Sequence, residues 1–497
     1  MKSEPQHSPA VLASRTFGED DQQAFARLTG DYNPIHIDPV AARRTQAGDV
    51  VAHGVHGALW ALDTLLAMGA ISGEIASLAV NFPRFVHLGK GVDLRIVSRK
   101  DSEIVATLSL GNIVATSLTI GLGATRELDD TMLDVGSPPP PKTRPANWTR
   151  MEDVAQLQGW MDVGASVDGI SAHFPHVAAK MGRERAAAIA LLSTIVGMEC
   201  PGLHSLFSSF SVRLADSPKA PNGVRFRVTY TDDRFRIIRL DVAGAGIRGE
   251  VRSFLRPLAV AQQDIGQIAR SISPTEFAGS TALIIGGSRG LGALVAKVIA
   301  AGGGRVVITY AKGKSDALEL EAEIRRHAGA SACTAIHYDA AQDPAPQLAS
   351  IGSSISHLYY FATPTIGQQR DGPFMPAVLE TFMAFYVTRF YECCRYLVSV
   401  SDRRPLTVFY PSTVFADNPP PTMIEYAMAK IAGELLCSHL NQSNIGVRVI
   451  AHRLPRLSTD QTATIPPVAA RDPLEAMLPI IREVQGVATP TSGSAAP

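Results

Sequence analysis

The sequence lacks an excess of charge of either sign. Its 497 residues include 46 Lys and Arg and 46 Asp and Glu, so the formal net charge is zero. Nucleic acids and anionic membranes are bound mainly through clusters of positive charge, which release counterions on binding. The balanced composition therefore argues against a nucleic-acid partner and against a membrane partner.

The sequence is also poor in cysteine and in long apolar runs. An odd number of thiols without a Cys-x-x-Cys spacing argues against a disulfide framework and against a metal site of the zinc type. Reduced, buried thiols are typical of a cytoplasmic protein. The longest apolar stretch, Ala186 to Met198, is too short to cross a bilayer, and the polar start MKSEPQHSPA has no apolar segment of a secretory signal.

The length predicts about three domains, at roughly 100–200 residues per domain. Two stretches are interpreted as linkers: residues 128–150, which hold the stiff run Pro138–Pro141, and the polar residues 263–278. The small, polar residues 485–497 are expected to be disordered. The domains expected from these boundaries are residues 1–127, 151–262 and 279–484.

The first two domains share an order of elements that indicates an internal repeat. In each, an apolar helix precedes four runs with strand character, which predicts an antiparallel sheet curved around one buried helix. The first set is Val55–Met68, then Ala76–Phe85, Gly91–Ser98, Glu103–Leu110 and Ile113–Leu122. The second set is Arg185–Met198, then Leu203–Leu214, Val224–Tyr230, Phe235–Val242 and Ile247–Leu255.

The pattern changes at residue 279, where strands and helices begin to alternate. The strand Thr281–Gly286 leads into a glycine turn and the helix Ala293–Ala301, and the strand Arg305–Tyr310 leads into the charged helix Ser315–Ala328. This alternation predicts an α/β domain with a doubly wound parallel sheet of the Rossmann type.

Asp31 and His36 form the first candidate site. Pro34 lies between them and prevents a regular helix, so the two side chains can converge on a bent loop. Hydration of an α,β-unsaturated thioester needs one group for the proton of water and another for the proton at the α-carbon. Backbone N–H groups at the helix start near Gly54 can stabilise the thioester oxygen. The alternative is a capped turn in which His36 is merely packed.

The stretch from Phe17 to Gly54 resembles the MaoC-like, (R)-specific enoyl-CoA hydratases. The matching segments are Phe25-Ala26-Arg27-Leu28-Thr29-Gly30-Asp31, Asn33-Pro34-Ile35-His36 and Ala52-His53-Gly54. The resemblance implies a hotdog fold, a catalytic dyad of Asp31 and His36, support from Asn33 and an oxyanion hole at the Gly54 amide. The second repeat lacks Asp-x-Asn-Pro-x-His and looks like the inactive half of an α+β double hotdog, whose degenerate half makes room for a long acyl chain.

The segment Gly286-Gly287-Ser288-Arg289-Gly290-Leu291-Gly292 follows a strand and opens a helix, which indicates a dinucleotide site. No acidic residue ends the next strand, where Thr309-Tyr310-Ala311-Lys312 stands. Arg289 and Lys312 offer positive charge that suits a 2′-phosphate, so NADPH is the expected cofactor rather than NADH.

Tyr426 and Lys430 lie one helical turn apart, so the ammonium can lower the pKa of the phenol and make it an acid at a carbonyl. Ser412 and Thr413 follow an apolar strand, and the spacing leaves open which hydroxyl holds the substrate oxygen. The alternative for a Tyr-x-x-x-Lys spacing is an ordinary helix surface.

Residues 281–462 resemble the short-chain dehydrogenases/reductases, in particular 3-oxoacyl reductases. The resemblance implies catalytic Ser412, Tyr426 and Lys430, support from Thr413, and cofactor contacts at Gly286, Ser288, Arg289, Gly290, Leu291, Gly292, Lys312, Asp339 and Ala362. Tyr360-Phe361-Ala362-Thr363 replaces the family's Asn-Asn-Ala-Gly, Arg456 follows Pro455 in place of glycine, and the helix asparagine is missing. Tyr386 or Thr388 lies near the asparagine's position and is a candidate to hold a relay water.

The sequence thus predicts a bifunctional enzyme that reduces 3-oxoacyl thioesters and dehydrates the (3R)-hydroxyacyl products, in fatty-acyl or polyketide-type metabolism. Its expected partners are an acyl-CoA or acyl-carrier-protein thioester and further copies of the chain, since both families usually form homodimers or larger assemblies. One alternative is an active hydratase joined to an impaired reductase fold that serves as a scaffold or nucleotide sensor. Another is a non-catalytic acyl-binding module.

Overall fold

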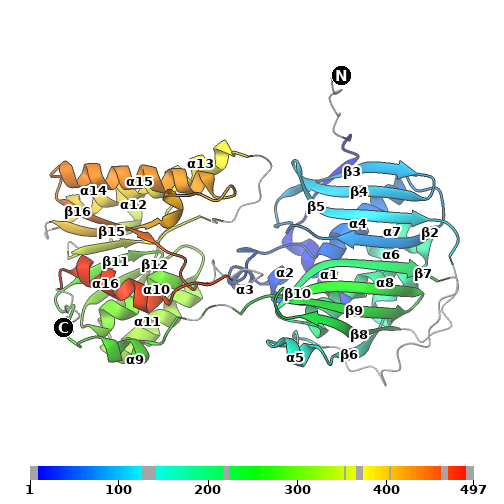
Figure 1. Cartoon of the computed structure of the whole chain (residues 1–497), viewed down its shortest axis with the longest axis horizontal. Coiled ribbons are helices and arrows are strands. Elements are labelled where there is room, and N and C mark those ends of the chain that lie inside the picture. The colour runs from blue at the N-terminus through cyan, green and yellow to red at the C-terminus, as the bar shows by residue number, and fades with distance from the viewer. Residues whose placement is uncertain are drawn as a thin grey trace, which may run out of the picture. The chain divides into compact units, whose positions relative to one another are not determined.

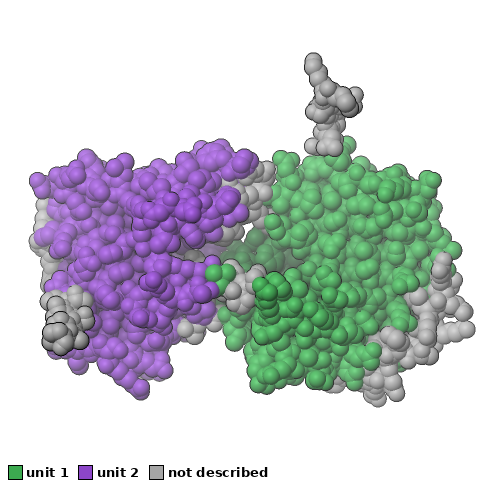
Figure 2. Space-filling view, viewed as in Figure 1, with its two compact units in different colours: residues 1–258, 464–468 green, residues 259–463, 469–497 purple. Residues whose placement is uncertain are grey.

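The computed structural model describes residues 9–125, 142–215, 223–258, 260, 262–351, 354–364, 366, 373–401, 405–459 and 468–487. The chain divides into two compact units, residues 1–258 with 464–468 and residues 259–463 with 469–497 (Figure 2). The proline run Pro138–Pro141 and residues 488–497 of the expected tail lie outside the described residues. In the described ranges, no helix is both long and apolar enough to span a membrane.

Unit 1 is built on a ten-stranded antiparallel sheet with the order β1-β3-β4-β5-β2-β7-β10-β9-β8-β6. Its strands are β1 (Ala13–Thr16), β2 (Ile75–Asn81), β3 (Gly91–Lys100), β4 (Glu103–Leu110), β5 (Ile113–Leu122), β6 (Gln158–Asp162), β7 (Ser205–Leu214), β8 (Gly223–Asp232), β9 (Ile237–Gly244) and β10 (Ile247–Leu255).

The sheet of unit 1 repeats one strand order in its two halves. From edge to centre, β1-β3-β4-β5-β2 corresponds to β6-β8-β9-β10-β7, and the halves meet where Leu78 of β2 pairs with Val212 of β7. Each half contains one strand more than the sequence pattern predicts, because β1 and β6 are short and contain no fully buried side chain. The repeated order is consistent with a hotdog-type antiparallel sheet.

The helices of unit 1 cover one face of this sheet (Figure 1). They are α1 (Glu19–Thr29), α2 (Pro34–Ile37), α3 (Pro39–Ala42), α4 (Gly54–Ala67), α5 (Met151–Val154), α6 (Gly164–His173), α7 (Pro175–Met181) and α8 (Arg183–Thr194), which continues as a π-helical turn over Ile195–Glu199. Every residue of α8 from Ala186 to Thr194 is buried, because this helix packs on the sheet, on α4 and on α6. Helices α4 and α8 are the predicted central helices of the two halves.

Unit 2 is a parallel six-stranded sheet between two layers of helices, with the order β13-β12-β11-β14-β15-β16 (Figure 1). This order is that of the Rossmann fold. Its strands are β11 (Thr281–Ile285), β12 (Arg305–Tyr310), β13 (Cys333–His337), β14 (His357–Tyr360), β15 (Leu406–Thr413) and β16 (Val447–Leu454). Its helices are α9 (Ile265–Ile268), α10 (Gly290–Ala301), α11 (Lys314–Ala328), α12 (Pro344–Leu348), α13 (Pro376–Met383), α14 (Phe390–Val400), α15 (Ile424–Gln442) and α16 (Pro473–Gln485).

The two helix layers of unit 2 enclose two separate apolar cores, because successive side chains of a strand point to opposite faces. In β11, Ala282 and Ile284 pack toward α10, α11 and α16, whereas Leu283 and Ile285 pack toward α13, α14 and α15. The parallel pairing of β11 with β12 also brings the carboxyl ends of both strands to one edge.

The segment 263–278 differs from the predicted linker. It contains α9 and a 3-10 turn at Ala269–Ser271, and Ile265, Ile268 and Phe277 are buried in the core formed with α10. The apolar residues in this stretch are too few to give a clear helical period, and its polar residues dominate the composition. The segment is therefore part of unit 2.

Candidate functional site

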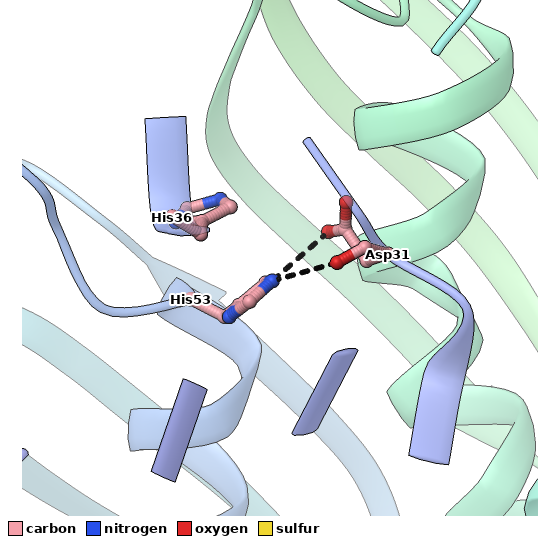
Figure 3. Close-up of side chains that lie close together, drawn as sticks. All are labelled: Asp31, His36 and His53. Atoms are coloured by element: carbon pink, nitrogen blue, oxygen red, sulfur yellow. Dashed lines mark hydrogen bonds and ion pairs between the residues drawn. The ribbon is translucent and has the colours of Figure 1, made fainter. Parts of the chain in front are cut away.

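The loop between α1 and α2 brings Asp31 and His36 together, as its proline-bent sequence predicts. Helix α1 ends at Gly30, whose φ of 83° is left-handed and turns the chain back. Asn33 caps α2 by accepting a hydrogen bond from the Ile35 N–H at 3.2 Å, and Pro34 takes the first helical position. One side-chain atom each of Asp31, His36 and His53 lies within 4.8 Å of the others (Figure 3).

The carboxylate of Asp31 is held by the second half of unit 1. It is 1% exposed, and its Oδ2 accepts a 2.6 Å hydrogen bond from the Ser193 hydroxyl on α8. Its Oδ1 accepts the Asn33 N–H at 3.2 Å. A Cβ atom on Gly197 would lie 2.3 Å from Oδ1, so only glycine allows the helix backbone to approach the carboxylate this closely.

Asn33 and Thr194 join the two halves around the same loop. The Asn33 amide donates to the carbonyl oxygens of Gly197 at 2.9 Å and Gly202 at 3.0 Å, and the Thr194 hydroxyl donates to the Thr29 carbonyl at 2.8 Å. Ser193, Thr194 and Gly197 carry no recognisable motif, and the sequence pattern did not single them out. The half without the Asp-x-Asn-Pro-x-His motif thus supplies part of the site.

His36 is oriented by a backbone hydrogen bond. Its Nδ1 lies 2.8 Å from the Val51 carbonyl oxygen, which can only accept, so Nδ1 is the donor. In the neutral ring this tautomer leaves the lone pair on Nε2. His36 can therefore act as a base through Nε2.

His53 is a third member of the cluster, which the sequence indicated only as part of a helix start. Its backbone N–H and its Nδ1 both lie 2.8 Å from the Oε1 of buried Gln22, and its Nε2 lies 3.1 Å from the Asp31 carbonyl oxygen and 3.7 Å from the Asp31 carboxylate. Its ring stacks on His36 with centroids 3.9 Å apart and planes 26° apart.

Burial shifts the pKa values of Asp31 and His36 in opposite directions. Desolvation raises the pKa of Asp31, against the opposing effects of His36 and of the Ser193 hydrogen bond. Desolvation lowers the pKa of His36, against the attraction of Asp31. These opposite shifts move the two pKa values toward each other, which suits proton exchange between the groups of an acid–base pair.

The N-terminus of α4 lies beside this pair and can bind an anionic oxygen. His53 is the N-cap residue and makes no side-chain capping bond, and α4 begins at Gly54. The N–H groups of a first helical turn have no partner within the helix and carry partial positive charge. A Cβ on Gly54 would lie 2.9 Å from the Phe82 ring, so a larger residue does not fit here.

The glycine-rich turn of unit 2 forms a cradle at the start of α10. A Cβ on Gly292 would lie 2.3 Å from the Gly286 carbonyl oxygen, which shows how closely the helix start packs on the turn. Gly286 and Gly287 donate their N–H groups to Thr309 on β12, and the N-cap residue Arg289 makes no side-chain capping bond. Uncapped amides beside the positive Arg289 and the nearby end of β12 fit the diphosphate of a dinucleotide.

The catalytic residues predicted in unit 2 lie at the end of β15 and on α15, but Ser412 and Thr413 differ in direction. The Ser412 hydroxyl donates to Glu434 at 2.5 Å, and Glu434 also accepts bonds from Arg453. The Thr413 hydroxyl accepts the Phe415 N–H at 3.2 Å, and its interaction with the Tyr426 phenol lowers the pKa of that phenol against the effect of burial. Because neighbouring residues of a strand point to opposite faces, only one of the two hydroxyls can face the phenol.

Lys430 is enclosed by aromatic rings. Its ammonium donates to the Pro411 carbonyl at 2.6 Å and lies 3.8 Å from the ring centroid of Tyr386 and 5.9 Å from that of Tyr426. Tyr386 belongs to a π-helical turn, Ala384–Arg389, and its hydroxyl pairs with Thr363. Burial lowers the pKa of Lys430 to about 7 and raises that of Tyr426 to about 12. The Tyr386 ring thus covers the ammonium directly.

The remaining cofactor residues expected from the sequence lie around the same edge of the sheet. Asp339 follows β13, where its N–H donates to Gln347 and its carboxylate accepts the Ala341 N–H at 2.9 Å. Ala362 follows β14, and its backbone nitrogen would lie 3.1 Å from a Cβ on Gly286. Lys312 follows β12 beside the glycine turn.

Comparison with known proteins places both units in families. Residues 1–115 match the MaoC like domain, and residues 280–467 match the short chain dehydrogenase family. A 3-hydroxybutyryl-CoA dehydratase of Methylorubrum extorquens is 30% identical over 112 residues, which cover 21% of this chain and 70% of that relative. The chain belongs to the MaoC-like dehydratase family through its N-terminal domain and carries a short-chain dehydrogenase domain toward its C-terminal end, which confirms the predicted fusion.

Solved structures similar to the chain include two complexes with NADP. The RhlG/NADP active-site complex of Pseudomonas aeruginosa is 22% identical, with a TM-score of 0.34, and the match covers 38% of this chain and 77% of that one. A short chain dehydrogenase of Burkholderia cenocepacia in complex with NADP is 20% identical, with a TM-score of 0.37, and the match covers 42% of this chain and 91% of that one.

We expect Asp31→Asn to stabilise unit 1 by an amount that increases with pH. Because burial raises the pKa of Asp31, the native carboxyl binds a proton at pH values where the unfolded one has released it. Its contribution to stability is full below the unfolded pKa of about 3.9 and is lost as the pH rises through the folded pKa. Asparagine keeps the shape of the side chain and does not ionise.

Thermal unfolding of both proteins from about pH 4 to about pH 8 measures this difference. A change of 1 kcal/mol shifts the Tm of a domain of this size by roughly 2–4 °C. Thr194→Val, which removes the neighbouring hydrogen bond to the Thr29 carbonyl, is the control and should alter Tm equally at every pH. A constant Tm difference between Asp31→Asn and the wild type would contradict the assigned pKa shift.

Proposed function

We propose that the chain is a bifunctional enzyme of acyl thioesters. Unit 1 interconverts enoyl and (3R)-hydroxyacyl thioesters, and unit 2 is an NADPH-dependent 3-oxoacyl-thioester reductase. The observation that supports this most is the convergence of Asp31 and His36 beside the uncapped N-terminus of α4. Fatty-acyl or polyketide-type metabolism uses both reactions on the same carbons.

In the proposed hydration, neutral His36 takes a proton from water through Nε2 as the oxygen bonds to the β-carbon. Electron density moves to the thioester oxygen, where the Gly54 amide stabilises it. The protonated Asp31 carboxyl then gives its proton to the α-carbon, and a proton returns from His36 to Asp31 to complete the cycle. Dehydration runs the same steps in reverse.

We further propose that unit 1 is a double hotdog with one catalytic half. The repeated strand order and the two central helices support this architecture. The second half contributes the Ser193 hydrogen bond, which stabilises the Asp31 carboxylate formed during proton transfer. The domain boundaries in this proposal follow the two compact units.

In unit 2, bound NADPH supplies the hydride for a 3-oxo group. The glycine turn would hold the diphosphate, and Arg289 at the N-cap of α10 and Lys312 after β12 would favour the 2′-phosphate of NADP over NAD. Tyr426 gives the proton to the carbonyl oxygen. Thr413, and not Ser412, orients that oxygen. The neighbouring Lys430 ammonium lowers the energy of the Tyr426 phenolate.

One observation favours a second candidate function for unit 2. Tyr386 covers Lys430 in the region where a relay water was expected, and Lys430 is bound to the Pro411 carbonyl. These contacts can impair proton resupply to Tyr426 without disturbing the dinucleotide cradle. In that case unit 2 binds NADPH as a scaffold or sensor, and only unit 1 is catalytic.

Hydration of crotonyl-CoA tests the function of unit 1. The reaction is measured as the loss of absorbance of the enoyl thioester. Asp31→Asn and His36→Gln should each lower kcat/KM by about 10²- to 10⁴-fold, the usual contribution of a general acid or base. Ser193→Ala should lower it by about tenfold or more, because hydrogen bonds to charged groups contribute roughly 1.5–3 kcal/mol. Thr194→Val is the matched control on the same helix and should have little effect.

Full activity in both Asp31→Asn and His36→Gln would refute the acid–base assignment. Equal losses in Ser193→Ala and Thr194→Val would show that α8 acts only through packing.

Oxidation of NADPH by acetoacetyl-CoA tests unit 2. Tyr426→Phe should lower the rate by about 10²- to 10⁴-fold, because the phenol is the proposed acid. Thr413→Val should lower the rate of NADPH oxidation strongly, and Ser412→Ala should lower it only slightly. The wild type should use NADPH in preference to NADH. NADPH binding without any wild-type turnover would favour the scaffold function instead, whereas a greater loss in Ser412→Ala would reverse the assignment of the hydroxyl.

A further inference from the structure

The positions of the reacting groups limit where the acyl chain can run. In the proposed hydration, the thioester oxygen lies at the Gly54 amide and the β-carbon lies between Asp31 and His36. Carbons beyond the β-carbon must therefore continue past Asp31 or past the residues that surround the start of α4. The packing on each of these sides decides how many further carbons fit.

The side behind Asp31 is closed by α8 and its π-helical extension. Ser193 bonds the carboxylate at 2.6 Å, and the backbone at Gly197 approaches so closely that one added carbon would lie 2.3 Å from Oδ1. The Asn33 amide fixes this backbone through the Gly197 and Gly202 carbonyls. A packed helix held by three hydrogen bonds leaves no path for methylene groups.

The side beside Gly54 is lined by three phenylalanines from both halves, of which Phe82 and Phe207 are partly buried. Phe82 follows β2, and its ring lies 2.9 Å from the position of a Cβ on Gly54. The rings of Phe207 and Phe210, on β7, lie with centroids 5.2 and 6.2 Å from that of Phe82. Phe210 is buried, and its strand is fixed by the pairing of Phe210 with Val80 of β2.

We propose that the hydratase site of unit 1 is specific for short-chain enoyl thioesters, with Phe82, Phe207 and Phe210 as the residues that set the limit. The proposal rests on the proposed hydratase function and names its substrate class. It reverses the expectation, drawn from family resemblance, that the degenerate half makes room for a long acyl chain. Here the degenerate half retains a complete central helix and adds two aromatic rings.

A chain-length series tests the proposal on the full chain. The substrates are crotonyl-, hexenoyl-, octenoyl- and dodecenoyl-CoA, and kcat/KM for hydration should fall as the acyl chain lengthens. The value for the shortest should exceed that for the longest by at least about a hundredfold, because an apolar pocket that lacks space rejects each added methylene by roughly 10- to 200-fold. Phe207→Ala and Phe82→Ala should raise the octenoyl-to-crotonyl ratio by about tenfold or more.

Phe226→Ala is the matched control, since it removes a buried phenylalanine from β8 of the same half and should leave this ratio unchanged. Calorimetric binding of crotonyl- and dodecenoyl-CoA to Asp31→Asn gives the same comparison without turnover. Tighter binding of crotonyl-CoA than of dodecenoyl-CoA supports the chain-length limit even if no thioester is hydrated. The absence of hydration would refute only the hydratase function. Equal or better hydration and binding of dodecenoyl-CoA, or an equal shift in Phe226→Ala, would overturn the limit.

Discussion

The buried carboxylate of Asp31 is the group on which the architecture of unit 1 depends. A carboxylate without partners is costly to bury, and its partners here come from both halves of the repeat. The Ser193 hydroxyl lies 162 residues away along the chain, yet it makes the shortest hydrogen bond to Asp31, and Gly197 admits the helix backbone to contact distance. The pairing of β2 with β7 fixes the two halves so that these contacts form.

The same burial gives the site its chemistry. Desolvation moves the pKa of Asp31 upward and that of His36 downward, so the two pKa values approach each other. The hydrogen bonds from Ser193 and Asn33 oppose the first shift and stabilise the carboxylate once its proton has left. The second half therefore contributes contacts to a carboxyl that it does not itself provide, although it lacks the Asp-x-Asn-Pro-x-His motif.

The sequence predicts those parts of the fold and site that are local along the chain. Asp31 and His36 are close in sequence and separated by a proline, and the glycine turn follows a buried strand, so spacing alone indicates both as candidate sites. The spacing of Asp31 and His36 does not distinguish a catalytic pair from a capped turn, and only the resemblance to the MaoC-like family favours the catalytic interpretation. The central helices and eight of the ten strands of unit 1 follow from regular apolar patterns. The short strands β1 and β6 were missed because four or five residues give no period.

Contacts that depend on tertiary packing were not predictable from the sequence. Ser193 and Gly197 occur in an apolar helix where serine and glycine are ordinary, and only the pairing of the two halves brings them to Asp31. His53 belongs to a recognisable helix start, but its stacking on His36 depends on the position of Gln22. Ser412 and Thr413 are adjacent, so the choice between them depends on which strand face meets α15, and composition carries no such information.

The environment of Lys430 connects the two candidate functions of unit 2. Burial lowers the pKa of Lys430 to about 7. A cation–π contact of about 0.5–2 kcal/mol and a single carbonyl acceptor offset only part of the cost of burying the ammonium. A neutral amine no longer favours the phenolate of Tyr426, whose pKa is about 12. An anionic ligand beside Lys430 would favour the ammonium and restore that effect. The proton affinity of this lysine, rather than the missing asparagine alone, therefore separates a reductase from a nucleotide-binding scaffold.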